Sequence, residues 1–448
     1  MKPKIEKQYL EKDFKDNYDA YQLNRMYGPL KHFCYAPHTS MFFSLHGKIS
    51  PCYATYGNSP DKFGKVSIRD SWFNSACENI RKEHESFDYS DNCEFCNQLF
   101  KTGAFGSMLA KKYEHYAFNK SKYPQIMEFE LSNRCNLECI MCDANLSSAI
   151  AKKQGLNAQV IDNYGDEFIE ELKEFVPHLK MAEFTGGDPF LIEKYYQIWD
   201  LILELNPKCE ILITTNANTM SERIEKLMSK TSKLHFNISF DAYSKDVYEQ
   251  IRINANYENV RKNIDSFNAY CKKHKTSMNL LVCPLTTNSR ELPKLIEFGN
   301  SLDVGVFFHT VVKPEDLSLK YQDEKYLNEL IEYLGKFEFP RKTWNQRTNA
   351  NNYSNLIVLL KAWRDEASNT KTQNKLEENP AYKLFYEETI SQGTKEQKEK
   401  IEKLLALINS QDESDIIFSK LSKMNKSEIE TKFKDLEIED FISFVLSL

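Results

Sequence analysis

The chain has 448 residues, of which 41% are hydrophobic, so it is long enough to bury a sizeable core in about two or three domains. Its formal net charge of −6 argues against nucleic acid as a partner, and no apolar run of about eighteen residues predicts a membrane span. The N-terminal segment lacks the apolar core of a signal peptide. We therefore expect a cytoplasmic protein whose eleven cysteines favour metal sites over disulfides.

The first part of the chain predicts a short lead-in followed by a small module. Residues 1–30 are polar and rich in tyrosine, which favours a helical lead-in. In the following segment, residues 31–120, two short strands are predicted at 41–45 and 48–53. They are joined at His46-Gly47, so together they predict a β-hairpin.

Four cysteines of this module fall into two groups. Cys34 and Cys52 flank the hairpin, and Cys93 and Cys96 form a C-x2-C pair further along the chain. Four thiolates in two groups can enclose a metal. From the residues alone, zinc suits this pattern almost as well as a [4Fe–4S] cluster.

Residues 121–315 alternate short apolar strands with amphipathic helices. Strands are predicted at 126–131, 180–184, 210–214, 234–240, 277–283 and 304–309. Helices are predicted between them at 162–175, 189–205, 221–228, 257–273 and 291–302. This alternation is typical of βαβ units around a parallel sheet, so the fold class is α/β. About six strands favour a partial, TIM-like (β/α)6 barrel, with catalytic residues beyond the C-terminal ends of its strands.

The loop after the first of these strands carries Cys135, Cys139 and Cys142 at the spacing C-x3-C-x2-C. Three thiolates on one short loop can close around a soft metal centre. Iron–sulfur cubanes normally take four cysteines, so three suggest a [4Fe–4S] cluster with one iron open to a small chelating ligand. Structural zinc usually takes two ligand pairs and fits this spacing poorly, and buried cysteines without a metal are the other alternative.

This cysteine loop resembles the signature of radical S-adenosylmethionine (radical SAM) enzymes. The resemblance implies that the open iron chelates the amino and carboxylate groups of SAM. Electron transfer into the sulfonium, from a donor such as flavodoxin or ferredoxin, then releases a 5′-deoxyadenosyl radical that abstracts hydrogen from the substrate. It also implies that Met141, the residue before the last cysteine, covers the adenine.

A turn rich in glycine follows the second predicted strand. It contains Gly186, Gly187 and Asp188, and on its own it is typical of an ordinary βα turn. Next to the cysteine loop it resembles the GGEP motif of radical SAM enzymes. That resemblance implies that its backbone and carboxylate receive the SAM amino group, with Asp188 in place of the usual Glu.

Further SAM contacts are implied at the later strand ends. Arg252 carries a planar guanidinium that can bind a carboxylate through two hydrogen bonds, although a solvated helix residue is an alternative. In SPASM-type relatives a matching serine and arginine contact SAM, which implies this role for Ser239 and Arg252. Asp241 can contact the ribose or cap a helix, and Asn288 can contact SAM or serve a turn.

The N-terminal cysteines resemble a second family feature. The pattern from Cys34 through Gly47 to Cys52, followed by Cys93 and Cys96, looks like the shortened SPASM domain called twitch. The resemblance implies an auxiliary [4Fe–4S] cluster, with zinc or no metal as alternatives. Such modules usually follow the radical SAM core, whereas this one precedes it.

The remaining residues, 316–448, are charged and predict a helical C-terminal region. Three functions are consistent with the whole pattern. The first is a radical SAM enzyme that oxidatively modifies a peptide or protein side chain. The second is a radical dehydrogenase or epimerase of a sugar, aminocyclitol or other small metabolite. The third is a non-catalytic metal-binding protein.

Overall fold

The structure is a computed structural model of the chain. It describes residues 17–25, 27–74, 76–85, 92–101, 103, 105–118, 121–156, 160–377, 400, 429, 431–433, 436 and 438–447. Most of the predicted lead-in and much of the predicted helical tail lie outside these residues. The chain forms two compact units. The first comprises Met1–Val282 and Phe298–Phe307, and the second comprises Cys283–Glu297 and Phe308–Leu448.

An eight-stranded sheet forms the centre of the fold, with the strand order β2-β1-β3-β4-β5-β6-β7-β8. The strands are β1 (Ser40–Phe43), β2 (Ile49–Ser50), β3 (Ile126–Phe129), β4 (Met181–Phe184), β5 (Glu210–Thr215), β6 (Leu234–Ser239), β7 (Met278–Val282) and β8 (Gly305–Phe308). Strand β1 and strands β3 to β7 pair in parallel, while β1 and β2 form the antiparallel hairpin that the sequence predicts. The α/β fold and its mostly parallel sheet are therefore confirmed.

The predicted strands are all present, as β3 to β8 and the hairpin strands β1 and β2, but they form one sheet. Six strands are expected from the βα repeats, but β1 of the N-terminal hairpin also joins the sheet by pairing with β3. Phe43 lies beside Phe129 in this register, and Phe129 lies beside Phe184. Their rings stack at centroid distances of 5.3 and 5.0 Å, so an aromatic row on the helix-covered face ties the hairpin into the barrel. The compact first unit thus runs across residue 120, and the domain boundaries stay a prediction.

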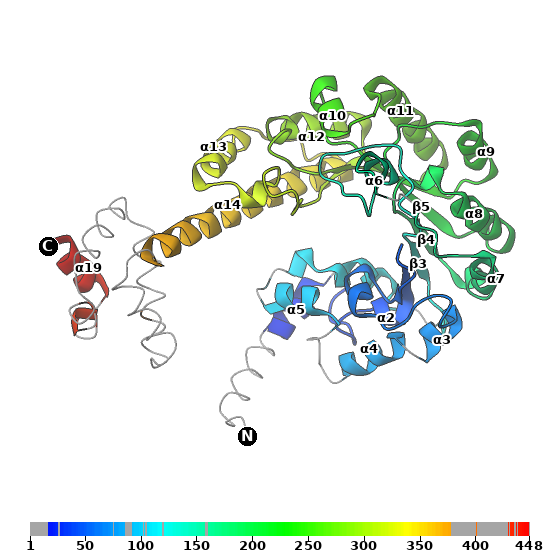
Figure 1. Ribbon diagram of the computed structural model, residues 1–448, viewed down its shortest axis with the longest axis horizontal. Helices are drawn as coiled ribbons and strands as arrows, with labels where there is room; N and C mark the ends of the chain where they lie inside the picture. Colours follow the sequence, from blue (N-terminus) through cyan, green and yellow to red (C-terminus); the bar gives the residue numbers. More distant parts are fainter. Residues whose placement is uncertain are drawn as a thin grey trace. The chain divides into compact units, whose positions relative to one another are not determined.

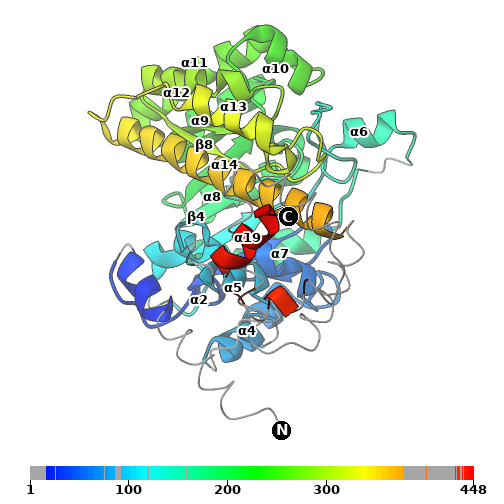
Figure 2. The same cartoon turned by 90° about the vertical axis from the view of Figure 1, so that its left-hand side faces the viewer.

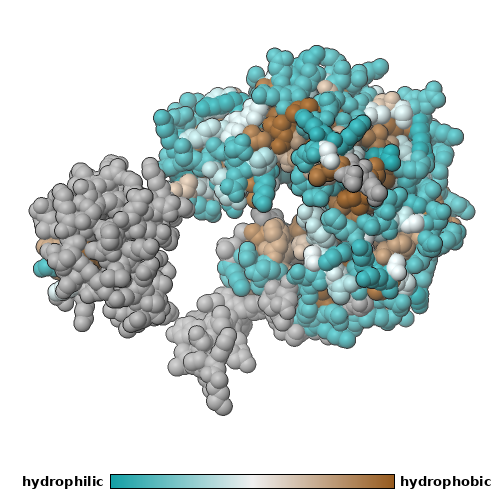
Figure 3. All heavy atoms as spheres, in the orientation of Figure 1, coloured by the Kyte–Doolittle hydropathy of each residue, from teal (hydrophilic) through white to brown (hydrophobic). Residues whose placement is uncertain are grey.

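Helices cover the outer face of the sheet, and Figure 1 shows α7, α8 and α9 outside β3, β4 and β5. The helices are α7 (Asp166–Phe175), α8 (Glu193–Leu205), α9 (Glu222–Lys230), α10 (Lys245–Ile251), α11 (Tyr257–His274) and α12 (Leu292–Leu302). Side chains cap several of them; for example, Ser221 accepts a hydrogen bond from the Ile224 N–H at the start of α9. The outer side of α7 to α9 is mainly hydrophilic (Figure 3).

The strands alternate between two environments, as half-buried strands should. Along β4, Ala182 and Phe184 are buried whereas Met181 and Glu183 are half-buried, and β5, β6 and β7 show the same alternation. The buried positions pack under the helices. The half-buried positions line the inner, concave face of the sheet, which is called the lumen below.

The N-terminal part of the first unit is built from short elements around an aromatic core. They are α2 (Ala36–Thr39), η1 (Tyr53–Asn58), α3 (Ile68–Phe73), α4 (Ala76–Glu85), α5 (Glu94–Lys101), η2 (Phe105–Ser107) and η3 (Leu109–Tyr116). Tyr21, Phe33 and Phe100 pack together in this core. Beside them lies a buried ion pair, in which Arg25 Nε is 3.0 Å from Glu114 Oε1. A core of this kind fixes the positions of the cysteines that it contains.

The second unit is helical where it is described, as the sequence predicts. Helices α13 (Glu324–Leu334) and α14 (Trp344–Glu377) pack against each other, and the Tyr353 hydroxyl donates to the Leu334 carbonyl at 2.8 Å. Helix α19 (Ile438–Ser447) lies near the C-terminus, and all three helices are labelled in Figure 2. Among the described residues, no helix is both long and apolar enough to cross a membrane.

Candidate active site

The loop that carries Cys135, Cys139 and Cys142 leaves β3 at the C-terminal edge of the sheet, as predicted. Two of its amides, those of Glu138 and Ile140, donate to the carbonyls of Ile253 and Ile251, each at 3.0 Å. These bonds hold the loop against the segment that follows α10. All three thiols are partly exposed at this edge of the sheet.

The three thiols share a partly desolvated environment. Burial raises the pKa of each, and it raises that of Cys139 to about 12 although the charge of Arg252 opposes the rise. Metal binding would displace these protons, since thiolates are the ligands. Within the described ranges, no three Cys, His, Asp or Glu side chains are placed to hold a single metal ion. In a cubane, however, each cysteine binds a different iron.

The glycine turn packs directly against the entry to the cysteine loop. The Gly187 N–H donates to the Ser132 carbonyl at 2.9 Å, and the Asp188 N–H donates to the Arg134 carbonyl at 2.8 Å. A Cβ atom on Gly187 would lie 2.2 Å from the Arg134 oxygen. Gly186 has a φ of +106° and the same lack of space. Both glycines are therefore needed for two backbone segments to meet.

Replacing Gly187 by Ala should disturb this junction. Because the added methyl group meets backbone rather than a flexible side chain, we expect the free energy of unfolding to fall by about 1–3 kcal/mol or more. Iron bound after reconstitution should fall as well. Gly106→Ala is the matched control, since nothing lies within 4 Å of its Cβ position. Chemical denaturation and iron analysis measure both effects, and equal stability of the two variants would contradict this account.

The Asp188 carboxylate is buried and accepts hydrogen bonds from other residues of the protein. Its Oδ2 accepts hydrogen bonds from the Thr215 hydroxyl at 2.8 Å and from the Asn216 N–H at 2.9 Å, while Oδ1 accepts from the Phe190 N–H at 3.1 Å. Burial raises its pKa, and these bonds oppose the rise. The side chain joins the loops after β4 and β5, and its predicted contact with the SAM amino group stays a prediction.

Asn216 is a site residue that the sequence did not single out. Its Nδ2 donates to the Asn136 side chain at 3.0 Å and lies 3.9 Å from the Cys135 sulfur. An asparagine directly after a strand is the only local signal, and it does not distinguish a turn from a site residue.

Arg252 is buried and is not the solvated helix residue that the sequence left as an alternative. Its guanidinium pairs with Asp241 at 2.7 Å, and the two side chains are 8% and 0% exposed. The same guanidinium lies 3.8 Å from the Cys139 sulfur. Ser239 is half-buried at the end of β6 and precedes Asp241 by two residues. Asp241 thus orients the Arg252 guanidinium beside the cysteine loop.

Residues 129–299 match the model of the radical SAM superfamily. This match identifies a radical SAM region within the chain. A region of this kind implies a [4Fe–4S] cluster and SAM, and the Cys135–Cys142 loop lies inside it.

The relatives of this radical SAM protein are distant. GTP 3′,8-cyclase of Limosilactobacillus fermentum is 26% identical over 45% of this chain and 57% of its own length. That of Clostridium botulinum is also 26% identical, over 31% and 42% respectively. The chain thus spans about half the length of the curated relatives it matches.

Two solved structures are also similar to parts of the radical SAM protein. The structure of anSMEcpe with bound AdoMet is 21% identical over 47% of this chain and 59% of that one, with a TM-score of 0.37. Streptococcus suis SuiB bound to S-adenosylmethionine is 16% identical over 60% and 59%, with a TM-score of 0.34.

Two predicted SAM contacts of the radical SAM protein are less specific. Met141 is half-buried between Cys139 and Cys142, where nothing in the structure tests its contact with adenine. Asn288 belongs to the second unit, where its side chain accepts from the Leu285 N–H at 2.7 Å and donates to the Cys283 carbonyl at 2.9 Å. These bonds support the alternative of a turn asparagine.

The four N-terminal cysteines come together although they are far apart in the sequence. Cys34, Cys52, Cys93 and Cys96 line one small, nearly apolar cavity. Burial raises the pKa of all four thiols, and the negative charge of neighbouring cysteines adds to the rise for Cys34 and Cys93. His84 also lines this cavity, with Nε2 3.3 Å from the Cys93 sulfur. His84 was not among the site residues predicted from the sequence.

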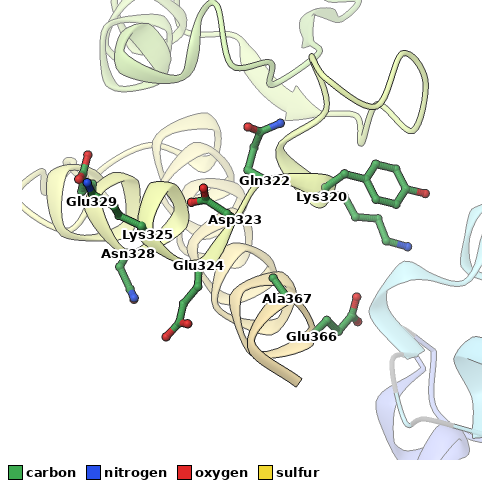
Figure 4. A pocket seen from close by; sticks show the side chains of 10 residues that line it. Lys320, Gln322, Asp323, Glu324, Lys325, Asn328, Glu329, Glu366 and Ala367 are labelled. Carbon is green, nitrogen blue, oxygen red and sulfur yellow. The ribbon is translucent and has the colours of Figure 1, made fainter. Parts of the chain in front are cut away.

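A larger hollow of about 1040 Å³ lies in the second unit (Figure 4). Its walls come from the segment around Tyr321, the first turns of α13 and the residues Glu366 and Ala367 of α14. The labelled polar side chains point in different directions and do not converge. No residue predicted to bind metal or SAM lines it.

Proposed function

We propose that this protein cleaves SAM reductively at a [4Fe–4S] cluster held by Cys135, Cys139 and Cys142. The observation that carries the proposal is the buried Arg252–Asp241 pair beside the three-cysteine loop. When bound there, such a cluster would supply the electron that cleaves SAM into methionine and a 5′-deoxyadenosyl radical, which would abstract a hydrogen atom from the substrate. A reduced flavodoxin or ferredoxin is the expected electron donor.

The chain's own residues bind and orient SAM. Arg252 offers its guanidinium to the SAM carboxylate, and Asp241 fixes the orientation of that guanidinium. The backbone at Gly186 and Gly187 lies against the cysteine loop, which supports its proposed contact with the amino group. Ser239 is a further proposed contact of SAM, and Met141 is the proposed contact of the adenine.

The N-terminal cavity is the proposed auxiliary cluster site. Four thiols and a largely apolar lining fit a fully ligated [4Fe–4S] cluster, for which no iron remains open to SAM. Held there, a cluster would accept the second electron of a substrate oxidation. Zinc stays the alternative metal.

For the substrate, we propose a peptide or protein side chain that is modified oxidatively, because enzymes with SPASM-like auxiliary clusters often modify peptides or protein residues. A small metabolite is the second candidate, and it is favoured by the sequence relatives, whose named activity is the cyclisation of GTP. A non-catalytic metal-binding protein is the third candidate, but that role does not account for the buried Arg252 beside the cysteine loop.

The proposed cleavage is tested with anaerobically reconstituted protein, SAM and dithionite. We expect 5′-deoxyadenosine and methionine in equal amounts, measured by liquid chromatography and mass spectrometry. Fully reconstituted protein that leaves SAM intact under these conditions would refute the proposal.

Arg252→Lys should weaken SAM binding. A hydrogen bond to a charged group contributes about 1.5–3 kcal/mol, so losing the bidentate contact should reduce affinity roughly tenfold to over a hundredfold. Arg223→Lys is the control, because that arginine pairs with Glu193 on the exposed surface. SAM titration monitored by isothermal calorimetry measures both. Unchanged affinity in Arg252→Lys would show that this residue serves only the structure.

A further inference from the structure

The lumen of the sheet contains a group of carboxylates that is only partly neutralised. Glu128 on β3 and Glu183 on β4 lie side by side in the register. Lys112 donates to both, at 2.8 and 2.6 Å. The hydroxyl of Tyr113 also donates to Glu128, at 2.7 Å. The single positive charge of Lys112 is thus shared between two carboxylates and does not neutralise a third.

Glu130 is that third carboxyl group. It follows the end of β3 and lies on the same side as Glu128, because side chains alternate along a strand. Within the described part of the chain, no hydrogen bond or ion pair engages its carboxyl oxygens. Burial raises its pKa to about 7. The group is therefore an acid without a counter-charge at the mouth of the lumen.

Three aromatic rings lie at the same mouth. Phe42 is 5.7 Å from Tyr53 and 5.8 Å from Tyr56 between ring centroids, and the two tyrosines are 5.6 Å apart. Phe42 pairs with Glu128 in the sheet, so its ring lies on the lumen side. The charge of Glu130 raises the pKa of Tyr53 after the effect of burial, which places these two side chains near each other. Tyr53 is 53% exposed, so the cluster is open to a ligand.

We propose that Glu130 with Phe42, Tyr53 and Tyr56 forms a substrate subsite for a cationic amino group. Aromatic faces attract cations, and an unneutralised carboxylate adds a direct charge contact. Tyr53 directly follows Cys52 of the proposed auxiliary site, and Glu130 precedes Cys135 of the proposed SAM cluster loop on the exit of β3. It rests on the proposed function in one respect, which is that the lumen receives the substrate.

This subsite narrows the substrate class. A lysine side chain or N-terminal amine of a peptide fits it, and so does the amine of an aminocyclitol or amino sugar. A nucleoside triphosphate does not, because its phosphates would meet Glu130, Glu128 and Glu183. The amine is an anchor here, and the hydrogen atom to be abstracted lies elsewhere on the substrate.

The test measures binding of amines to the reconstituted holoprotein with SAM present. Isothermal calorimetry compares the tripeptide Ala-Lys-Ala with its Nε-acetylated form, and adds 2-deoxystreptamine as the aminocyclitol. We expect the charged ligands to bind and the acetylated one to bind roughly tenfold more weakly or worse. Whichever charged ligand binds more tightly assigns the source of the amine.

Glu130→Gln and Tyr53→Leu should each weaken binding of the preferred amine, the first by about tenfold or more. Glu225→Gln on the outer surface of α9 is the control and should leave it unchanged. The subsite is separate from the proposed SAM site, so the variants should still cleave SAM. A wild-type protein that does not cleave SAM would count against the proposed function and not against the subsite. Amines that bind wild type and Glu130→Gln equally, or bind neither, would overturn the subsite.

The pH dependence of binding gives a second readout. Below its pKa of about 7 the Glu130 carboxyl is neutral, so amine affinity should rise between about pH 6 and pH 8 in wild type and stay flatter in Glu130→Gln. The titratable or charged groups on its side of the sheet are Tyr53, Glu128, Glu183 and Lys112, while Tyr164 and Tyr195 lie near it on the helix-covered face. They are present in both proteins, so the difference between the two pH profiles isolates Glu130. Identical profiles would refute its contact with the amine.

Discussion

Cys139→Ala is expected to abolish 5′-deoxyadenosine formation. Cys139 is the central thiol of the loop and lies 3.8 Å from the Arg252 guanidinium, so its loss removes one of the three proposed ligands and a contact of that arginine. Two thiolates cannot hold a cubane that already leaves one iron open. We expect SAM cleavage to fall below detection in the dithionite assay.

The control for this variant is Cys271→Ala. Cys271 is buried on α11, and its thiol donates to the Ser277 carbonyl at 3.4 Å, away from the cysteine loop. It should lose some stability as a core residue but keep SAM cleavage. Normal cleavage by Cys139→Ala, with its fold intact by circular dichroism, would exclude the loop as the cluster site.

Removing the four N-terminal cysteines is expected to separate two activities. The variant with Ala at Cys34, Cys52, Cys93 and Cys96 should bind about four irons instead of about eight, because it loses one cluster of four. It should still form 5′-deoxyadenosine, since the loop at Cys135 is unchanged. Formation of an oxidised product should stop, because the electron left on the substrate after hydrogen abstraction has no acceptor.

These four thiols lie in an apolar core, so their combined removal also tests the fold. The double variant Cys93→Ser and Cys96→Ser, which changes only α5 and the residue before it, serves if the quadruple variant is unstable. Iron near four per chain with one zinc in the wild-type protein would contradict the proposed electron transfer and make the module structural.

Local sequence predicted most of the fold, for a physical reason. Strand and helix periods are properties of neighbouring residues, so β4, β5 and α11 begin within a residue of their predicted starts. The pairing of β1 with β3 was not predicted, because it joins segments that are far apart in sequence. The stacked phenylalanines contribute to that pairing, but phenylalanine is common in any core and does not identify a partner strand.

The site shows the same division. Spacing alone placed the three cysteines on one loop, and the glycine pair marked a close backbone approach that the structure explains by the Arg134 carbonyl. The partners of these residues were not predictable. Asp241 meets Arg252, and His84 meets Cys93, only after the chain folds. Asp188 was assigned to SAM from the motif, whereas its carboxylate also binds Thr215 and Asn216 inside the protein.

The most direct test of the central claim is an electron paramagnetic resonance measurement on the quadruple N-terminal variant. With the auxiliary site removed, the only expected signal of the dithionite-reduced protein comes from the cluster at Cys135, Cys139 and Cys142. Because one iron of that cluster is open, adding SAM should change the g-values of the signal. A reduced [4Fe–4S] signal that stays the same at saturating SAM would contradict the proposed SAM site.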